Sequence, residues 1–448
     1  MHPFTVLLRE ARATFVLAVP LIAGQLSHML MAVVDTLMIG RLGVVPLAAA
    51  TFANNVIHLP FMVVIGLTIA VSVRVSQARG AADPPAARAA LRHGMFLGLC
   101  AGILTVIGAV ALAPFLGWFG QEAEVAGVAG TYFQIVGVSM IPAACSMAIK
   151  NHADAMNRPW PAFAILLVAV GLNVLLNWIL IYGKMGFPAL GLEGAGIATL
   201  IARTLGFFGL LYWCTHDRRI REWVPHHWFR KPDWIAVRSL IRIGLPASMQ
   251  LLAESSAFVV ATILIGTISK EALASHQVAL TCAATIFMVP LGLSMALTVR
   301  TGEAWGAGAY DRLRPIVLSA GLMAILYTVF SAQCFVFFND AIAGWFLKDP
   351  VALKLSATLL LVAAAFQFSD ALQIVFAGAL RGLDDVRVPA WLAFFAYWII
   401  SLPLGWWLSY GLKWGVAGMW WGITVGLTLT AVALGVRVWV KTAGRPAL

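Results

Sequence analysis

Long runs of apolar residues are the feature that most restricts how this 448-residue chain can fold. The runs are about 20 residues long, the length that an α-helix needs to cross a bilayer. Hydrophobic residues make up 61% of the chain and charged residues only 11%, whereas soluble domains carry about 25% charged residues. Strands of a transmembrane β-barrel are shorter and alternate in polarity. The sequence therefore predicts an all-α polytopic membrane protein.

Charged residues, glycine and proline divide the apolar runs into twelve expected spans. These lie near residues 14–38, 47–73, 94–118, 130–149, 161–182, 194–214, 240–264, 273–297, 316–337, 352–378, 389–409 and 416–437. No small-residue cleavage site closes a short apolar core, so we expect the first span to be retained and not removed as a signal peptide.

The distribution of Lys and Arg predicts the orientation of the spans. Of the 30 basic residues, 23 fall on one side of the expected membrane, six on the other, and Arg203 lies within a span. Cytoplasmic loops carry the excess of positive charge, so we expect both termini in the cytoplasm. The net charge of +11 is then a consequence of topology, and no nucleic-acid partner is expected.

The two halves of the chain superpose without a gap when Pro20 is aligned with Pro246. This alignment also places Gly40 on Gly266, Gly66-Leu67 on Gly292-Leu293 and Val73-Arg74 on Val299-Arg300. An internal repeat of this kind predicts two six-helix lobes that enter the membrane in the same direction and enclose a site between them. We expect an N-terminal lobe over 1–215, a cytoplasmic linker over 216–238 and a C-terminal lobe over 239–448.

Three carboxylates, Asp35, Glu254 and Asp370, lie well inside expected spans. A charged carboxylate near the bilayer centre costs at least about 2.5–3.5 kcal/mol, so such residues usually face a cavity and bind an ion or a substrate. The alternative is a neutral buried carboxyl, or one that only packs against Ser or Asn of a neighbouring helix.

In the first half, Asn173 and Asn177 are four residues apart and share one helix face, and Thr199 lies in the next span. Their oxygens, with a carboxylate, suit Na⁺, and the carboxylate can instead hold a proton. The alternative is that both Asn residues only join helices by hydrogen bonds. Met31 and Met38 flank Asp35 and would form an adaptable wall of its cavity.

In the second half, Phe366 precedes Asp370 by one helical turn. A ring face beside a carboxylate suits a lipophilic cation, although Phe in an apolar helix more often packs. Gln277 could add an amide to the same cavity or serve only as a helix contact.

Signatures of enzymes are missing from the sequence: we find no HExxH, phosphate loop, GxGxxG or GxSxG. The five cysteines lie in apolar runs without a CxxC and predict no disulfide or zinc site. The hypothesis is therefore a transporter without a cofactor, driven by a cation gradient, with no metal beyond possible Na⁺.

Six segments resemble the multidrug and toxic compound extrusion family in its NorM-type branch. They are VDTLMIGRLG (34–43), LNVLLNWILIYGKMGFPALGLEGAGIAT (172–199), KPDW (231–234), IGLPASMQLLAESSAF (243–258), ASHQVA (274–279) and FSDALQIVFAGALRG (368–382). The resemblance implies a V-shaped pair of six-helix lobes in the bacterial inner membrane. It also implies a monomeric antiporter that exports bulky cationic or aromatic drugs and dyes in exchange for Na⁺ or H⁺.

The resemblance also implies roles for individual residues. Asp35, with Asn173, Asn177 and Thr199 around it, corresponds to the cation carboxylate of the amino lobe, and Glu254 and Asp370 to the cation site of the carboxy lobe. The expected substrate-binding residues are Asp35, Met31, Met38, Gln277, Phe366 and Asp370. Phe366 stands where some relatives of this branch carry Tyr.

Two other functions fit parts of the sequence. A flippase for a lipid-linked or polysaccharide precursor would share the fold, but an anionic diphosphate calls for Arg or Lys in the cavity, and only Arg203 is expected inside a span. A membrane-embedded enzyme would need clustered His, Asp and Ser at one membrane face, and the sequence shows no such cluster.

Overall fold

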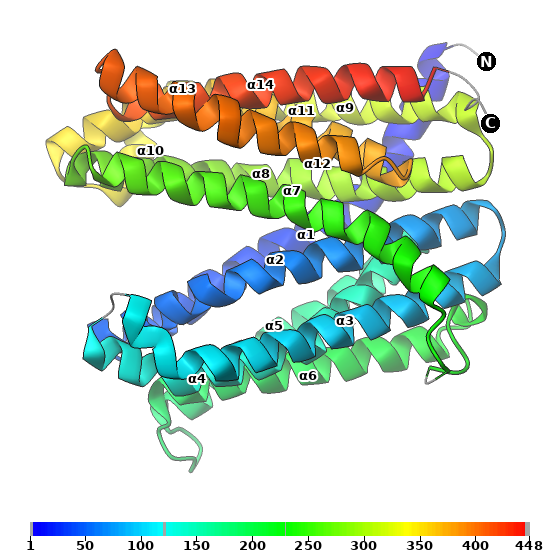
Figure 1. The fold of residues 1–448 in the computed structure, drawn as a ribbon, viewed down its shortest axis with the longest axis horizontal. Helices are drawn as coiled ribbons and strands as arrows, with labels where there is room; N and C mark the ends of the chain where they lie inside the picture. Colours follow the sequence, from blue (N-terminus) through cyan, green and yellow to red (C-terminus); the bar gives the residue numbers. More distant parts are fainter. Residues whose placement is uncertain (1–2, 120–121, 229, 444–448) are drawn as a thin grey trace. The chain divides into compact units, whose positions relative to one another are not determined.

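The computed structural model describes residues 3–119, 122–228 and 230–443, and every regular element in these ranges is helical. Twelve helices in this part of the chain are long and apolar enough to cross a membrane (Figure 1). The all-α polytopic fold is thus confirmed.

The first half of the chain contains six long helices followed by a short turn in the linker. They are α1 (Pro3–Gly40), α2 (Val44–Gly80), α3 (Pro84–Leu112), α4 (Ala123–Ala155), α5 (Pro159–Tyr182) and α6 (Gly191–His216), with the 3₁₀ segments η1 (Ala113–Phe119) and η2 (Arg221–Trp223).

The second half repeats this order with one interrupted span. Its elements are α7 (Trp234–Gly266), α8 (Lys270–Gly306), η3 (Tyr310–Arg312), α9 (Leu313–Phe337), α10 (Asn339–Phe346), α11 (Pro350–Gly382), α12 (Arg387–Phe394), η4 (Phe395–Ser401), α13 (Leu402–Trp406), η5 (Trp407–Gly411) and α14 (Val416–Lys441). Here η4 and η5 are π-helical. The alignment of the two halves carries both ends of α2 onto the ends of α8, so the repeat seen in the sequence is also a repeat of helices.

Side-chain caps fix several helix starts. Asp83, Ser269 and Asp349 each accept a hydrogen bond from the backbone N–H three residues later, at 2.8–3.1 Å. Such caps satisfy backbone donors that a helix end leaves free. Proline follows two of these caps, at a position where its missing N–H costs nothing.

The chain forms two compact units, one of Ala23–Ser248 and one of Met1–Ile22 with Met249–Leu448. Both boundaries fall inside helices, α1 and α7, at positions that the alignment of the halves pairs with each other. Each of these helices therefore contributes its two ends to different units. The division of the chain into lobes at residues 215 and 239 stays a prediction.

Each unit is built around one central helix. In the unit of Ala23–Ser248, α4 packs against α2, α3 and α6. In the other unit α11, the repeat counterpart of α4, packs against α8, α9 and α14. Figure 1 shows the helices of each unit running side by side. Most of α11 is buried. This central helix carries Asp370, one of the three predicted carboxylates, and Asp370 is among its buried residues.

Most helices extend beyond the expected spans. α1 begins at Pro3 and not near residue 14, and the stretch left between the expected spans 47–73 and 94–118 is reduced to a short turn between α2 and α3. The expected bounds followed hydropathy, whereas helices continue past the hydrocarbon region as long as backbone bonding and polar partners allow.

Candidate functional site

Asp35 is joined to the amides predicted to surround it, all within the unit of Ala23–Ser248. Asn177 on α5 donates from Nδ2 to Oδ1 of Asp35 at 2.6 Å and to Oδ1 of Asn173 at 3.3 Å. Asn173 Nδ2 lies 3.4 Å from the Thr199 hydroxyl on α6. The structure thus brings all four predicted cation-binding residues of this half into one chain of contacts across three helices.

One oxygen in this cluster has no partner. The Oδ1 atom of Asn177 is buried and accepts no hydrogen bond from the described residues, and both Asn side chains are fully buried. A buried carbonyl oxygen without a donor costs free energy. Beside a carboxylate, such an oxygen is available to a proton donor or a cation.

A positive group also lies near Asp35. Arg203 on α6 donates to the hydroxyl of Ser139 at 2.7 Å, and its charge is close enough to interact with Asp35. Two groups of opposite charge therefore share this region, and the carboxylate does not face apolar surroundings alone.

The two methionines predicted beside Asp35 are both half-buried. Met38 packs on the apolar core formed by α2, α4 and neighbouring helices, and its backbone carbonyl accepts from the Tyr182 hydroxyl at 2.8 Å. The proposed contact of Met31 and Met38 with substrate stays a prediction.

Glu254 and Asp370 meet inside the other unit, from α7 and α11. Their carboxyl groups are close enough to interact electrostatically, and Arg381, further along α11, also interacts with Glu254. Arg381 is buried and donates to the Ser294 hydroxyl at 2.9 Å. When both carboxyl groups are ionised, one guanidinium balances only one of them, which leaves a single negative charge for a monovalent cation.

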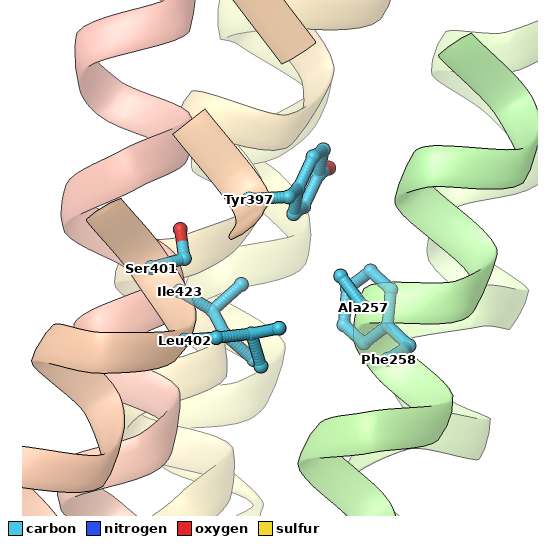
Figure 2. A pocket seen from close by; sticks show the side chains of 6 residues that line it. All are labelled: Ala257, Phe258, Tyr397, Ser401, Leu402 and Ile423. Atoms are coloured by element: carbon cyan, nitrogen blue, oxygen red, sulfur yellow. The ribbon is translucent and has the colours of Figure 1, made fainter. Parts of the chain in front are cut away.

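Tyr397 supplies a phenol that sequence reasoning missed. It lies in the π-helical segment η4, where it interacts with Glu254 and approaches Oε1 of Gln373 at 3.4 Å. Figure 2 shows its ring extending toward α7, where Phe258 and Ala257 lie. π-Helical turns often mark functional positions, but no sequence pattern revealed this one.

Phe366 is buried in an aromatic cluster and not exposed beside Asp370. Its ring meets Trp420 edge-on with centroids 5.4 Å apart and Phe258 at 6.3 Å. Trp420 donates in turn to the imidazole of His276 at 3.1 Å. Gln277, the next residue, is exposed. The substrate-binding roles of Phe366 and Gln277 stay predictions.

Comparison with known protein families shows that both halves of the repeat match the same family model. Residues 20–179 and 246–407 each match the family model described as MatE. The two matches begin at residues 20 and 246, the same pair of positions that aligns the halves of the chain.

Relatives match nearly the full length. The chain is 34% identical to "Probable multidrug resistance protein NorM" of Agrobacterium fabrum, over 95% of this chain and 93% of the relative. It is 34% identical to "Multidrug resistance protein PmpM" of Pseudomonas aeruginosa, over 96% and 91%.

Solved structures agree with the fold. A structure described as MATE in the bent conformation matches with a TM-score of 0.90 at 20% identity, covering 99% of this chain and 98% of that one. The eukaryotic MATE transporter AtDTX14 matches with a TM-score of 0.88 at 22% identity, covering 98% of each chain. With 34% identity to NorM-named relatives over nearly its whole length, the chain belongs to the MatE family, the multidrug and toxic compound extrusion transporters, in its NorM-type branch, and is a transporter and not an enzyme.

Proposed function

We propose that this chain exports bulky cationic and aromatic compounds from a bacterial cytoplasm in exchange for Na⁺ or H⁺. The observation that carries the proposal is the contact of Asp35 with Asn177, whose own carbonyl oxygen is left without a donor among the described residues. A half-buried carboxylate with an amide oxygen beside it that accepts no hydrogen bond from the described residues is suited to bind a cation that comes and goes.

Relatives support the substrate class. The names of the NorM and PmpM proteins describe multidrug resistance, and carboxylates in the spans favour cations over anions. Both termini of this inner-membrane protein lie in the cytoplasm under the same proposal, since the excess of Lys and Arg falls on that side.

The two carboxylate clusters differ in charge. Asp35 has Arg203 within electrostatic range, so one negative group meets one positive group. Glu254 and Asp370 interact with each other, and Arg381 interacts with Glu254, so two negative groups meet one positive group. On this ground we propose that Glu254 and Asp370 also bind the coupling cation, in addition to Asp35, where drug and cation exchange.

The alternative, export of a lipid-linked or polysaccharide precursor, would need free cationic groups for a diphosphate. Arg203 and Arg381 are the candidates, but each lies within reach of a carboxylate and donates to a serine hydroxyl. Their charges are therefore already engaged, and the drug antiporter is the better explanation.

The decisive experiment is efflux of ethidium from membrane vesicles, with a Na⁺ gradient imposed separately from a pH gradient. Wild type should export dye under at least one gradient. Asp35→Asn should fold normally, because Asn occupies the same volume, but lose gradient-driven export. The control is Asp340→Asn, which removes an exposed carboxylate on α10 and should export like wild type.

Two results would overturn this function. Dye export by Asp35→Asn at the wild-type rate would remove Asp35 from the mechanism. Wild-type vesicles that ignore both gradients but move a lipid-linked diphosphate would favour the alternative.

A further inference from the structure

An apolar groove runs along one side of the unit that contains α9, α11 and α14. Both α9 and α14 pack along α11 but have no comparable contact with each other, so α11 forms the floor between two walls. The resulting cavity has a volume of ≈ 230 Å³ and is almost entirely apolar. The residues that line it include none of the carboxylates described above.

Two glycines keep the groove open. Gly321 on α9 and Gly435 on α14 both face the ring of Phe376 on α11, with Cβ positions 4.0 and 3.1 Å from the ring. Leu318 and Leu322 on the α9 wall are 47% exposed. From Arg314 to Ile325 the groove follows α9 for about 16 Å, at about 1.5 Å per residue, roughly half the thickness of a bilayer core.

One end of the groove carries a positive charge, that of Arg314. The guanidinium of Arg314 lies 4.3 Å from the centre of the Trp439 ring. Its Nε atom is buried without a hydrogen-bond partner, and no carboxylate pairs with it among the described residues. The neighbouring cations on α14, Arg437 and Lys441, differ because both pair with Asp385.

The repeat-related arginine has an oxygen acceptor. The alignment of the two halves carries Arg314 onto Arg88 and Trp439 onto Trp213. In that half Arg88 Nε donates to the backbone oxygen of Glu222 at 2.6 Å, and the linker segment η2 packs against both α3 and α6. The linker therefore gives Arg88 an oxygen acceptor that Arg314 does not have among the described residues.

We propose that the groove between α9 and α14 binds an anionic phospholipid of the cytoplasmic leaflet. Its phosphate pairs with Arg314 and one acyl chain lies over Phe376 between the two glycines. The volume of the groove is smaller than that of small-molecule pockets, which is about 300–1,000 Å³. Its long, apolar form suits an acyl chain and not a drug. Basic pockets at the cytoplasmic ends of helices are known to select anionic headgroups.

Native mass spectrometry of delipidated protein in detergent tests the proposal. The probes are phosphatidylglycerol and phosphatidylcholine with identical acyl chains, added at equal concentrations. Wild type should bind phosphatidylglycerol more tightly, and Arg314→Ala should weaken that binding about fivefold or more, to the level of phosphatidylcholine. The matched control, Arg12→Ala, removes an exposed arginine of α1 and should change nothing.

A second variant tests whether the groove holds the acyl chain. Gly321→Leu extends into the groove, and because a Cβ there meets only the Phe376 ring, at an ordinary contact distance of 4.0 Å, the protein should still fold. It should weaken binding of both lipids. Millimolar inorganic phosphate should not displace phosphatidylglycerol, because the acyl chain is part of the ligand.

Three outcomes would overturn the proposal. These are equal affinity of wild type for both lipids, a phosphatidylglycerol preference that survives Arg314→Ala, and binding that appears only after the chain is truncated after Ala443. The last would mean that the tail, and not a lipid, occupies the groove. Because dye efflux is not measured, none of these results bears on the proposed transport function.

Discussion

Glu10 on α1 is bound by Arg300 on α8, a residue 290 positions further along the chain. The carboxylate is 1% exposed, and Arg300 also donates to the Glu10 backbone oxygen at 2.9 Å. Arg312 donates to the same carboxylate at 3.2 Å. All three belong to one compact unit, so this cluster fastens the start of α1 to that unit.

Glu10→Gln should lower the thermal stability of the protein markedly. The substitution removes a buried carboxylate that pairs with Arg300 and Arg312, and removing one partner of a buried ion pair typically costs about 3–5 kcal/mol. Thermal unfolding in detergent measures the effect. Asp311→Asn removes an exposed acidic residue of η3 and should leave the midpoint unchanged; equal midpoints for both variants would show that the cluster contributes nothing.

Gly292 and Gly66, related by the repeat, should both resist substitution by alanine. A Cβ on Gly292 would lie 2.8 Å from the backbone nitrogen of Ile22, and one on Gly66 would overlap the backbone of Ser248. Overpacking against backbone costs about 1–3 kcal/mol, so both variants should unfold at lower temperature. Gly108→Ala, which meets nothing within 4 Å, should be neutral or slightly stabilising.

The spans could be predicted because hydropathy is a property of local sequence. Their ends could not, since α1 extends to Pro3 with the buried Glu10, which forms ion pairs with Arg300 and Arg312, far along the chain. The break of one span into α12, η4, α13 and η5 was also missed. Pro403 removes a backbone donor there, but the spacing of apolar residues is continuous through the break.

The residues of the candidate site, too, could be predicted from the sequence only in part. Asn173 and Asn177 could be paired from their spacing, because residues four apart share a helix face. Tyr397 and Arg381 could not be placed beside Glu254, because this contact depends on how α7, α11 and η4 pack. The burial of Phe366 between Phe258 and Trp420 is likewise set by aromatic rings that are distant in sequence.

Tyr397→Phe tests whether its phenol oxygen serves a cation. If it is a Na⁺ ligand with Glu254, its loss should raise the Na⁺ concentration for half-maximal dye release about tenfold, the equivalent of one strong hydrogen bond. Tyr327→Phe is the control, because that hydroxyl donates to the Ile286 carbonyl and to no carboxylate among the described residues. An unchanged Na⁺ dependence in Tyr397→Phe would exclude the phenol from the ion site.

Glu254 and Asp370 should behave as one unit in transport. Because the two carboxyl groups interact, removing either leaves the other in an altered field. Efflux defects of Glu254→Gln and Asp370→Asn, measured singly and together, should therefore be non-additive by about 0.5–3 kcal/mol. Additive defects would place the two residues in independent sites.

Coupling of drug and ion can be tested by their effects on each other's binding. If a cationic dye and the coupling ion both need ionised carboxylates, each must weaken the binding of the other, and this linkage is reciprocal. Higher Na⁺, or lower pH, should release dye from detergent-solubilised protein. Asp35→Asn or Asp370→Asn should blunt that release, since each removes a carboxylate for which the two cations compete.

In this measurement ionic strength must be held constant, because added salt also screens charges. Dye affinity that stays flat from pH 5 to 8 and over roughly 0–200 mM Na⁺, a range in which competing cations would differ, would contradict antiport and leave the fold unaffected.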